Sequence, residues 1–227
     1  MLSSISIIPR LCLFAYVCLS LTACGVEDTK PETQEIKSNK QELGAPVNND
    51  YMVVVNRPNN MHFVDLSTDE IIRTCKLPSR VLPGTVVMSP DNLTAYVLAG
   101  SFDRILGYNV NDCNLVFDTQ FSHDNIRVKS IGSLAVSPDG KEVYTIYNPT
   151  KILNDRYEIM DTEFVIYNVE DGVNAKPVRT YPVPRQINIM RSGDDGRVYL
   201  SGSDVFVIDP ATGKLNTAIY SQSKHRE

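Results

Sequence analysis

The sequence has 227 residues, of which 42% are hydrophobic and 22% are charged, and its formal net charge at pH 7 is −5. This balance is typical of a folded domain with a sizeable core. Nucleic-acid binding needs clustered Lys and Arg, which this slightly acidic chain lacks, so we expect no nucleic-acid partner. The sequence contains neither Trp nor a Cys-x-x-Cys-His motif for attaching c-type haem. Any associated redox chemistry must therefore reside on another polypeptide or a diffusible cofactor.

Residues 1–23 have the features of a signal peptide. They carry one charge, Arg10, followed by the apolar run Leu11–Leu19, which is too short to cross the roughly 30 Å of a bilayer's hydrocarbon core. The run leads into Leu-Thr-Ala before Cys24, which resembles a bacterial lipobox with Cys24 as the lipidated, mature N-terminus. An ordinary signal peptide that happens to contain a Cys is the alternative. We expect export to the periplasm and a lipid anchor on the membrane.

Residues 24–49 are predicted to be a flexible tether between the lipid and a folded domain. They are rich in Glu, Lys, Gln, Pro and Asn and contain no aromatic residue, so they cannot bury enough surface to fold. A second polar segment, residues 221–227, ends the chain as a tail.

Two cysteines remain in the expected folded domain, Cys75 and Cys113. An oxidising periplasm would allow them to form a disulfide, but two separate buried thiols fit the sequence equally well. A metal site would need more ligands at closer spacing, and the three histidines, His62, His123 and His225, form no ligand pattern.

Short apolar runs alternate with polar turns throughout residues 50–220, and one turn recurs in phase. In each copy an apolar strand ends in Asp or Asn before a polar turn, at Asp65, Asn109, Asn168 and Asp209. The copies are 44, 59 and 41 residues apart. Periods of roughly 40–50 residues with several strands each are typical of β-propeller blades.

A second marker precedes a strand in three of these units: Ser89-Pro-Asp-Asn92, Ser137-Pro-Asp-Gly140 and Gly193-Asp-Asp-Gly196. Asp followed by Asn or Gly accepts tight hairpin geometry, so each marker is predicted to join two antiparallel strands. We therefore predict an all-β fold, a β-propeller with about four blades of four antiparallel strands. The surplus in the longest unit falls at residues 148–162, a predicted surface insertion. A β-sandwich with chance turn similarity is the less favoured alternative.

Several segments resemble a known family beyond these general signals. They are Tyr51–Asp69, Pro83–Thr85 with Ser89–Asn92 and Ala95–Leu98, Ser137–Tyr144, Asn148–Thr150 with Leu153–Asp155, and Ala175–Gln186. In order along about three quarters of the chain, they resemble the β subunit of bacterial quinohaemoprotein amine dehydrogenase, a seven-bladed propeller of the Tyr-Val-Thr-Asn type. The four units correspond to its N-terminal part.

The resemblance implies an enzyme of three different chains that oxidises primary amines to aldehyde and ammonia. A dihaem α subunit carries haem c, a small γ subunit carries cysteine tryptophylquinone, and the β subunit binds no redox cofactor. Cys75 and Cys113 fall where that subunit has cysteines. On this reading the chain is a noncatalytic scaffold subunit with no catalytic, cofactor-binding or metal-binding residue of its own.

The sequence contains no catalytic constellation, because its acidic residues are concentrated in turns. Asp65, Asp91, Asp139, Asp195 and Asp209 are best interpreted as turn formers. Two loops are the candidate subunit contacts, because propeller loops present function on a rigid scaffold and Arg is favoured at interfaces. They comprise Asn56, Arg57, Asn59 and Asn60 in one loop and Asn154, Asp155 and Arg156 in the other.

Two functional classes follow from the sequence. The first is the scaffold subunit of a periplasmic amine dehydrogenase. The second is a stand-alone, lipid-anchored propeller that binds a protein or ligand at the cell envelope.

Overall fold

The computed structural model describes residues 50–78 and 81–218. The predicted signal peptide, the tether, Cys24 and the polar tail lie outside this part of the chain. The described residues form antiparallel sheets, and their single helical segment is the 3-10 turn η1 (Val169–Asp171). No helix within the described ranges has the length and apolar character needed to cross a membrane.

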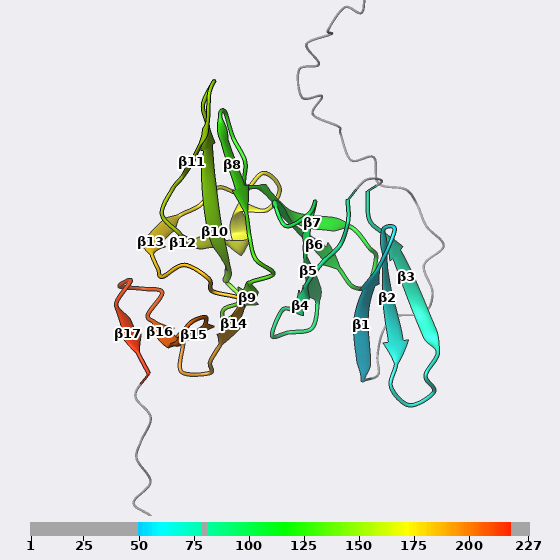
Figure 1. Cartoon of the computed structure of the whole chain (residues 1–227). Helices are drawn as coiled ribbons and strands as arrows, with labels where there is room; N and C mark the ends of the chain where they lie inside the picture. Colours follow the sequence, from blue (N-terminus) through cyan, green and yellow to red (C-terminus); the bar gives the residue numbers. More distant parts are fainter. Residues whose placement is uncertain (1–49, 79–80, 219–227) are drawn as a thin grey trace, which may run out of the picture. The chain divides into compact units, whose positions relative to one another are not determined.

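The first two sheets are simple antiparallel meanders (Figure 1). Sheet 1 has three strands, β1 (Tyr51–Asn56), β2 (Asn60–Asp65) and β3 (Ile71–Lys76). Sheet 2 has four strands, β4 (Val86–Met88), β5 (Thr94–Ala99), β6 (Arg104–Asn109) and β7 (Leu115–Gln120).

Sheet 3 has six strands because β10 is long enough to pair with four others. It comprises β8 (Ile126–Lys129), β9 (Leu134–Val136), β10 (Glu142–Ile152), β11 (Tyr157–Ile159), β12 (Glu163–Asn168) and β13 (Arg179–Pro182). The first half of β10 pairs with β9 and β12, and its second half pairs with β8 and β11. We call the second half of β10, together with β8 and β11, the arm. The predicted insertion is thus folded into strands.

Sheet 4 has four strands, β14 (Ile189–Ser192), β15 (Val198–Ser201), β16 (Val205–Ile208) and β17 (Leu215–Thr217). The predicted all-β fold and the four blade-like units are confirmed. Two sheets depart from the predicted four strands. Sheet 3 has six because it includes the arm. Sheet 1 has three, and β1, β2 and β3 correspond to the second, third and fourth strands of a blade, so one edge of β1 has no neighbouring strand among the described residues.

The recurring turn forms for the reason that the sequence indicated. The carboxylate of Asp65 accepts a hydrogen bond from the backbone N–H of Ser67 at 2.7 Å, and Asn109 and Asp209 accept from the residue two positions on at 2.8 and 2.9 Å. Such side-chain acceptors replace a backbone partner and fix the turn. Asn168 differs, since its side chain makes no such bond and η1 follows it.

The second marker is built in the same way in sheets 2 and 3. The hydroxyl of Ser137 donates to Asp139 at 2.6 Å and accepts from the backbone N–H of Glu142 at 2.9 Å. Ser89 and Asp91 make the equivalent bonds. Gly140 adopts φ +73° in this turn, a conformation that glycine accepts without strain.

The sheets pack face to face through three clusters of buried apolar side chains. One cluster lies between sheets 1 and 2 and includes Phe63 and Leu106. The next lies between sheets 2 and 3 and includes Phe117 and Tyr167, whose rings meet edge to face with centroids 6.2 Å apart. The third lies between sheets 3 and 4 and includes Phe164. Each interior face is thus covered by a neighbouring sheet.

A disulfide joins Cys75 on β3 to Cys113 in the turn between β6 and β7, with the two Cα atoms 5.6 Å apart. Of the two alternatives that the sequence left open, the structure therefore has the bonded one. The bond links sheet 1 to sheet 2 across their shared cluster, in which Cys75 is fully buried.

Removing this bond is expected to destabilise the protein. The cysteines are 38 residues apart, and a chain-entropy treatment of a loop of that size assigns the cross-link about 4 kcal/mol of stability. Urea unfolding of the Cys75→Ala/Cys113→Ala variant should show a lower midpoint than the wild type, and added reductant should not lower it further. A Cys24→Ser variant serves as the control and should keep its reductant sensitivity. Equal midpoints for the wild type with and without reductant would contradict the stabilising role.

Candidate functional site

A pocket of about 880 Å³ lies between sheets 3 and 4. It is formed by four turns: two of sheet 3 (137–142 and 168–170) and two of sheet 4 (194–196 and 209–211). In an antiparallel meander, turns that join strands one to two and three to four share one end of the sheet. We call this the turn end, and the opposite end the loop end.

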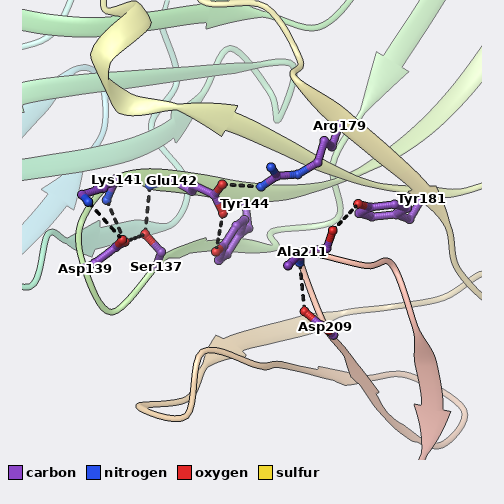
Figure 2. Close-up of polar contacts among 9 residues, drawn as sticks. All are labelled: Ser137, Asp139, Lys141, Glu142, Tyr144, Arg179, Tyr181, Asp209 and Ala211. Carbon is purple, nitrogen blue, oxygen red and sulfur yellow. Dashed lines mark hydrogen bonds and ion pairs between the residues drawn. The ribbon is translucent and has the colours of Figure 1, made fainter.

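A polar network crosses the wall of the pocket (Figure 2). Glu142 at the start of β10 forms an ion pair with Arg179 on β13 and accepts a hydrogen bond from the Tyr144 hydroxyl at 2.8 Å. Burial, followed by the bond to Glu142, raises the pKa of Tyr144 well above its usual value, so this phenol stays protonated and acts as a donor. The network therefore links β10 to β13 and places Glu142 at the pocket wall.

The pocket lining is acidic, with six carboxylates against two cations: Asp139, Glu142, Glu170, Asp194, Asp195 and Asp209 against Lys141 and Arg179. Hydrogen bonds from Ser137, Arg197 and Thr212, respectively, lower the pKa of Asp139, Asp195 and Asp209. A general acid at neutral pH needs a raised carboxyl pKa, so these three groups are unsuited to proton donation. The arrangement instead suits the binding of a cationic group.

The loop end carries a different kind of surface. Phe102, in the loop between β5 and β6, is 40% exposed, and its backbone adopts φ +71°, an unusual conformation for a bulky residue. Its ring lies against Gly84, where an added Cβ would be 2.4 Å from the ring, and its carbonyl accepts from the N–H of Ser130 at 2.7 Å. Leu82 and Ile131 nearby are 38% and 46% exposed. Three loops that contact one another through Gly84, Phe102 and Ser130 thus each expose an apolar side chain.

In the first predicted contact loop, two of the four named residues are half-buried and the other two are exposed. Asn59 is half-buried, and it anchors the loop by donating from its side chain to the carbonyl of Leu77 at 2.6 Å. Asn60 begins β2 and is also half-buried. Asn56 and Arg57 are exposed, so these two remain the candidates for contact.

The second predicted contact loop forms the tip of the arm. Asn154, Asp155 and Arg156 are all exposed, and the last two form an ion pair with each other at 3.1 Å. Both predicted loops join the second blade strand to the third, so the topology places them at the loop end, but no hydrogen bond or ion pair joins them.

The arm also exposes apolar side chains that the sequence reasoning did not single out. Tyr157 and Ile159 on β11 are 69% and 67% exposed. Ile152 lies directly opposite Tyr157 in the register, so three large apolar side chains share one face of the arm. The signal in the sequence was the alternation Tyr-Glu-Ile within the predicted insertion.

The pocket at the turn end was also missed, because it needs turns from two units to meet. Each turn was recognisable by itself, but no pattern in the sequence says how two successive sheets diverge. Within residues 50–78 and 81–218, no group of three or more His, Cys, Asp or Glu side chains is arranged to hold a metal ion.

Comparison with known proteins shows the fold. No family model matches the chain, and no curated protein matches it. Among solved structures, it is similar to the Cps50 (Swd1) β-propeller domain of Myceliophthora thermophila, with a TM-score of 0.54 and 17% identity over 76% of this chain and 51% of that one. Hydrazine synthase of Kuenenia stuttgartiensis gives 0.56 and 14% identity over 80% and 51%.

A protein of unknown function from Desulfotomaculum acetoxidans gives a TM-score of 0.53 and 15% identity over 75% of this chain and 50% of that one. The chain therefore spans about half the length of the solved structures that it matches. At identities this low, the structural similarity shows a propeller-type fold alone, and the function must be argued from the residues.

The lowered pKa values of two turn carboxylates predict how the stability of the protein depends on pH. Hydrogen bonds from Ser89 and Ser137 lower the pKa values of Asp91 and Asp139 in the folded state. Their stabilisation is therefore present above the unfolded value of about 3.9 and is lost as the pH falls through the lower folded value. Asn at both positions keeps the acceptor oxygen and removes the charge.

The Asp91→Asn/Asp139→Asn variant should be less stable than the wild type at pH 5, and the gap should narrow at pH 3. Urea midpoints at the two pH values measure this difference. The control is Glu70→Gln/Glu158→Gln, which removes two exposed charges outside these turns. Its urea midpoint should change between the two pH values as much as that of the wild type does. If the urea midpoints of all three proteins changed equally between pH 5 and pH 3, the turn carboxylates would have no role in the pH dependence of stability.

Proposed function

We propose that this chain is a noncatalytic scaffold subunit of a periplasmic amine dehydrogenase complex, whose haem c and cysteine tryptophylquinone reside on a dihaem α chain and a small γ chain. The collinear sequence resemblance supports the assignment, and the propeller-type fold agrees with it. The observation that carries a scaffold role is the exposed apolar surface at the loop end. A protein without a partner has little reason to expose large side chains together, because they cost free energy in water.

The arm is the main docking element in this proposal. Its exposed face presents Tyr157 and Ile159 from β11, with Arg156 at the tip. Aromatic residues and Arg are enriched at protein interfaces, and Tyr supplies a large contact area with few rotatable bonds. The opposite face of the arm packs inward through Val128, which is buried in the cluster between sheets 2 and 3, so the exposed face is held by a rigid base.

The loops at the same end extend the docking surface. Phe102, Leu82 and Ile131 belong to the described loops beside the arm, and Lys129 on β8 forms an ion pair with Asp103 at 2.7 Å that links the arm to the Phe102 loop. Arg57 contributes from sheet 1. A partner docked here would contact several sheets at once, which is what enclosing a small quinone-bearing chain requires.

Reconstitution with a dihaem chain and a quinone-bearing chain tests this proposal. The purified chain alone should show neither haem or quinone absorbance nor amine-dependent dye reduction, and the three chains together should reduce the dye. The Tyr157→Ser/Ile159→Ser variant should bind the partners at least about tenfold more weakly, because burying each side chain is worth roughly 1.5–3 kcal/mol.

Val173→Ser is the matched control, since Val173 is 49% exposed but lies at the turn end. It should bind as the wild type does. Equal binding by the arm variant would remove the arm from the interface, and turnover by this chain alone would refute the scaffold role.

The acidic pocket favours a second candidate, a stand-alone propeller that binds a cationic ligand or a basic protein segment at the cell envelope. With Arg197 paired to Asp195, its six carboxylates still outnumber three cations, which provides charge complementarity for such a ligand. The reconstitution separates the two candidates. Association with both redox chains selects the subunit, and failure to associate at any concentration selects the stand-alone propeller.

Both proposed functions include export and lipid anchoring of the protein. These two features are inferred from the sequence of residues 1–24, which precede the described residues. The apolar run ending at Cys24 supports cleavage before that residue and its lipidation. Mass spectrometry of membrane-extracted protein should find a di- or triacylated N-terminal Cys24, and Cys24→Ser should release the protein from the membrane. A lipid-free mature terminus at another residue would overturn the anchor.

A further inference from the structure

The arm has two outer edges, one along β8 and one along β11, because β10 lies between these strands (Figure 1). In an antiparallel pair, the backbone N–H and C=O groups of successive residues point alternately toward the paired strand and away from it. Every second residue of β8 and of β11 therefore presents its backbone groups at an outer edge. What bonds these groups decides whether a further strand can be added there.

The outer edge of β8 is satisfied by the chain itself. The backbone N–H of Val128 donates to the Ser122 hydroxyl at 3.0 Å, and that of Ile126 donates to the carbonyl of His123 at 2.8 Å. The segment before β8 thus folds back along this edge and occupies its outward groups. A further strand cannot pair here without breaking these bonds.

The outer edge of β11 lacks such bonds. Ile152 on β10 bonds toward β8, since its N–H donates to the carbonyl of Asn125 at 2.7 Å and its own carbonyl accepts from the Asn125 side chain at 3.3 Å. Tyr157 lies directly opposite Ile152, so the two form a non-hydrogen-bonded pair and the backbone groups of Tyr157 point away from β10. Ile159, two residues along the strand, has the same orientation.

The neighbouring bond agrees with this alternation, since the N–H of Met160 donates to the carbonyl of Pro149 at 3.0 Å. The N–H and C=O groups of Tyr157 and Ile159 thus form a row along the outer edge, and no strand in the described part of the chain pairs with it. A row of unpaired backbone groups on an edge strand is a template for a further strand.

The side chains of β11 specify the kind of strand that this edge accepts. Tyr157 and Ile159 are exposed on one face, and Glu158 is exposed on the other. In an added antiparallel strand, the residues opposite Tyr157 and Ile159 form hydrogen-bonded pairs, and the residue opposite Glu158 forms the closer, non-hydrogen-bonded pair. Apolar residues therefore suit the two flanking positions, and Lys or Arg suits the central position.

A second copy of β11 does not meet this requirement. Antiparallel pairing of all three residues with their counterparts sets the two Glu158 side chains directly opposite each other. Like charges in directly opposite positions are destabilising. The charge at the centre of β11 thus favours a segment of a different chain.

We propose that β11 accepts an extended segment of a partner protein as an added antiparallel strand, and that this segment has an apolar–basic–apolar pattern opposite β11. Backbone bonds to an open edge supply affinity in this mode of binding, and alternate side chains supply specificity. The inference deepens the proposed scaffold function, on which its biological use rests, by specifying how the arm binds a partner chain.

Amide hydrogen exchange, followed by NMR on the full chain carrying Cys24→Ser, tests this proposal with the synthetic peptide acetyl-Ser-Thr-Val-Lys-Val-Thr-Ser-amide. Saturating peptide should slow exchange of the Tyr157 and Ile159 amides by about tenfold or more, because a bonded amide must open before it exchanges. The Glu158 amide already points toward β10, so its exchange should change least.

A peptide with Glu in place of Lys is the matched control. It should bind about threefold more weakly or worse, because it sets two carboxylates opposite each other. Glu158→Lys in the protein should reverse the preference between the two peptides. Ile159→Pro removes one outward N–H at a position where an edge strand tolerates proline, and it should weaken binding of the lysine peptide more than Ile159→Ala, which keeps that N–H.

Three results would overturn the proposal: no protection of Tyr157 and Ile159 by the lysine peptide, equal affinity for the two peptides, or an unchanged preference in Glu158→Lys. Protection of these amides that grows with protein concentration in the absence of peptide would also overturn it, because a second copy would then occupy the edge. The assay contains no redox chain, so its failure is distinguishable from a failure of the three chains to associate.

Discussion

The packing of one sheet on the next is the interaction on which the rest of this structure depends. A sheet of three or four short strands cannot shield its apolar side chains by itself, and here each interior face is covered by a neighbouring sheet. The burial of Phe63, Phe117 and Phe164 between successive sheets is therefore what orders the individual strands.

This packing leaves the two ends of the sheets free to specialise. The β9–β10 turn at the turn end is internally bonded, because Ser137 and Asp139 satisfy its backbone groups. The loop end contains the arm and the Phe102 loop with its left-handed backbone. A protein that binds partners through its loops needs a rigid scaffold to position those loops, and the hydrogen-bonded turns contribute to that rigidity.

The sequence was most informative where chemistry is local. Asp65, Asn109 and Asp209 could be recognised as turn formers because an Asx turn depends only on residues two or three positions away. The disulfide required a distance between Cys75 and Cys113 that no local pattern contains. The extra pairing of β8 with β10 was missed for the same reason, since its residues are about twenty positions apart and the alternation of a three- or four-residue strand is weak. The pocket depends on two sheets and was beyond any local pattern.

The disulfide also determines how the fold would respond to a pull on its N-terminus. The chain enters the described structure at Asp50, directly before β1, and an extending force would therefore load sheet 1 first. Peeling β1 and β2 away exposes their apolar side chains, but Cys75 on β3 is covalently tied to sheet 2. Tension that reached β3 would pass through the sulfur–sulfur bond into the turn after β6. Mechanical unravelling would thus halt at Cys75, and the released strands would remain tethered beside the surface to which they must return.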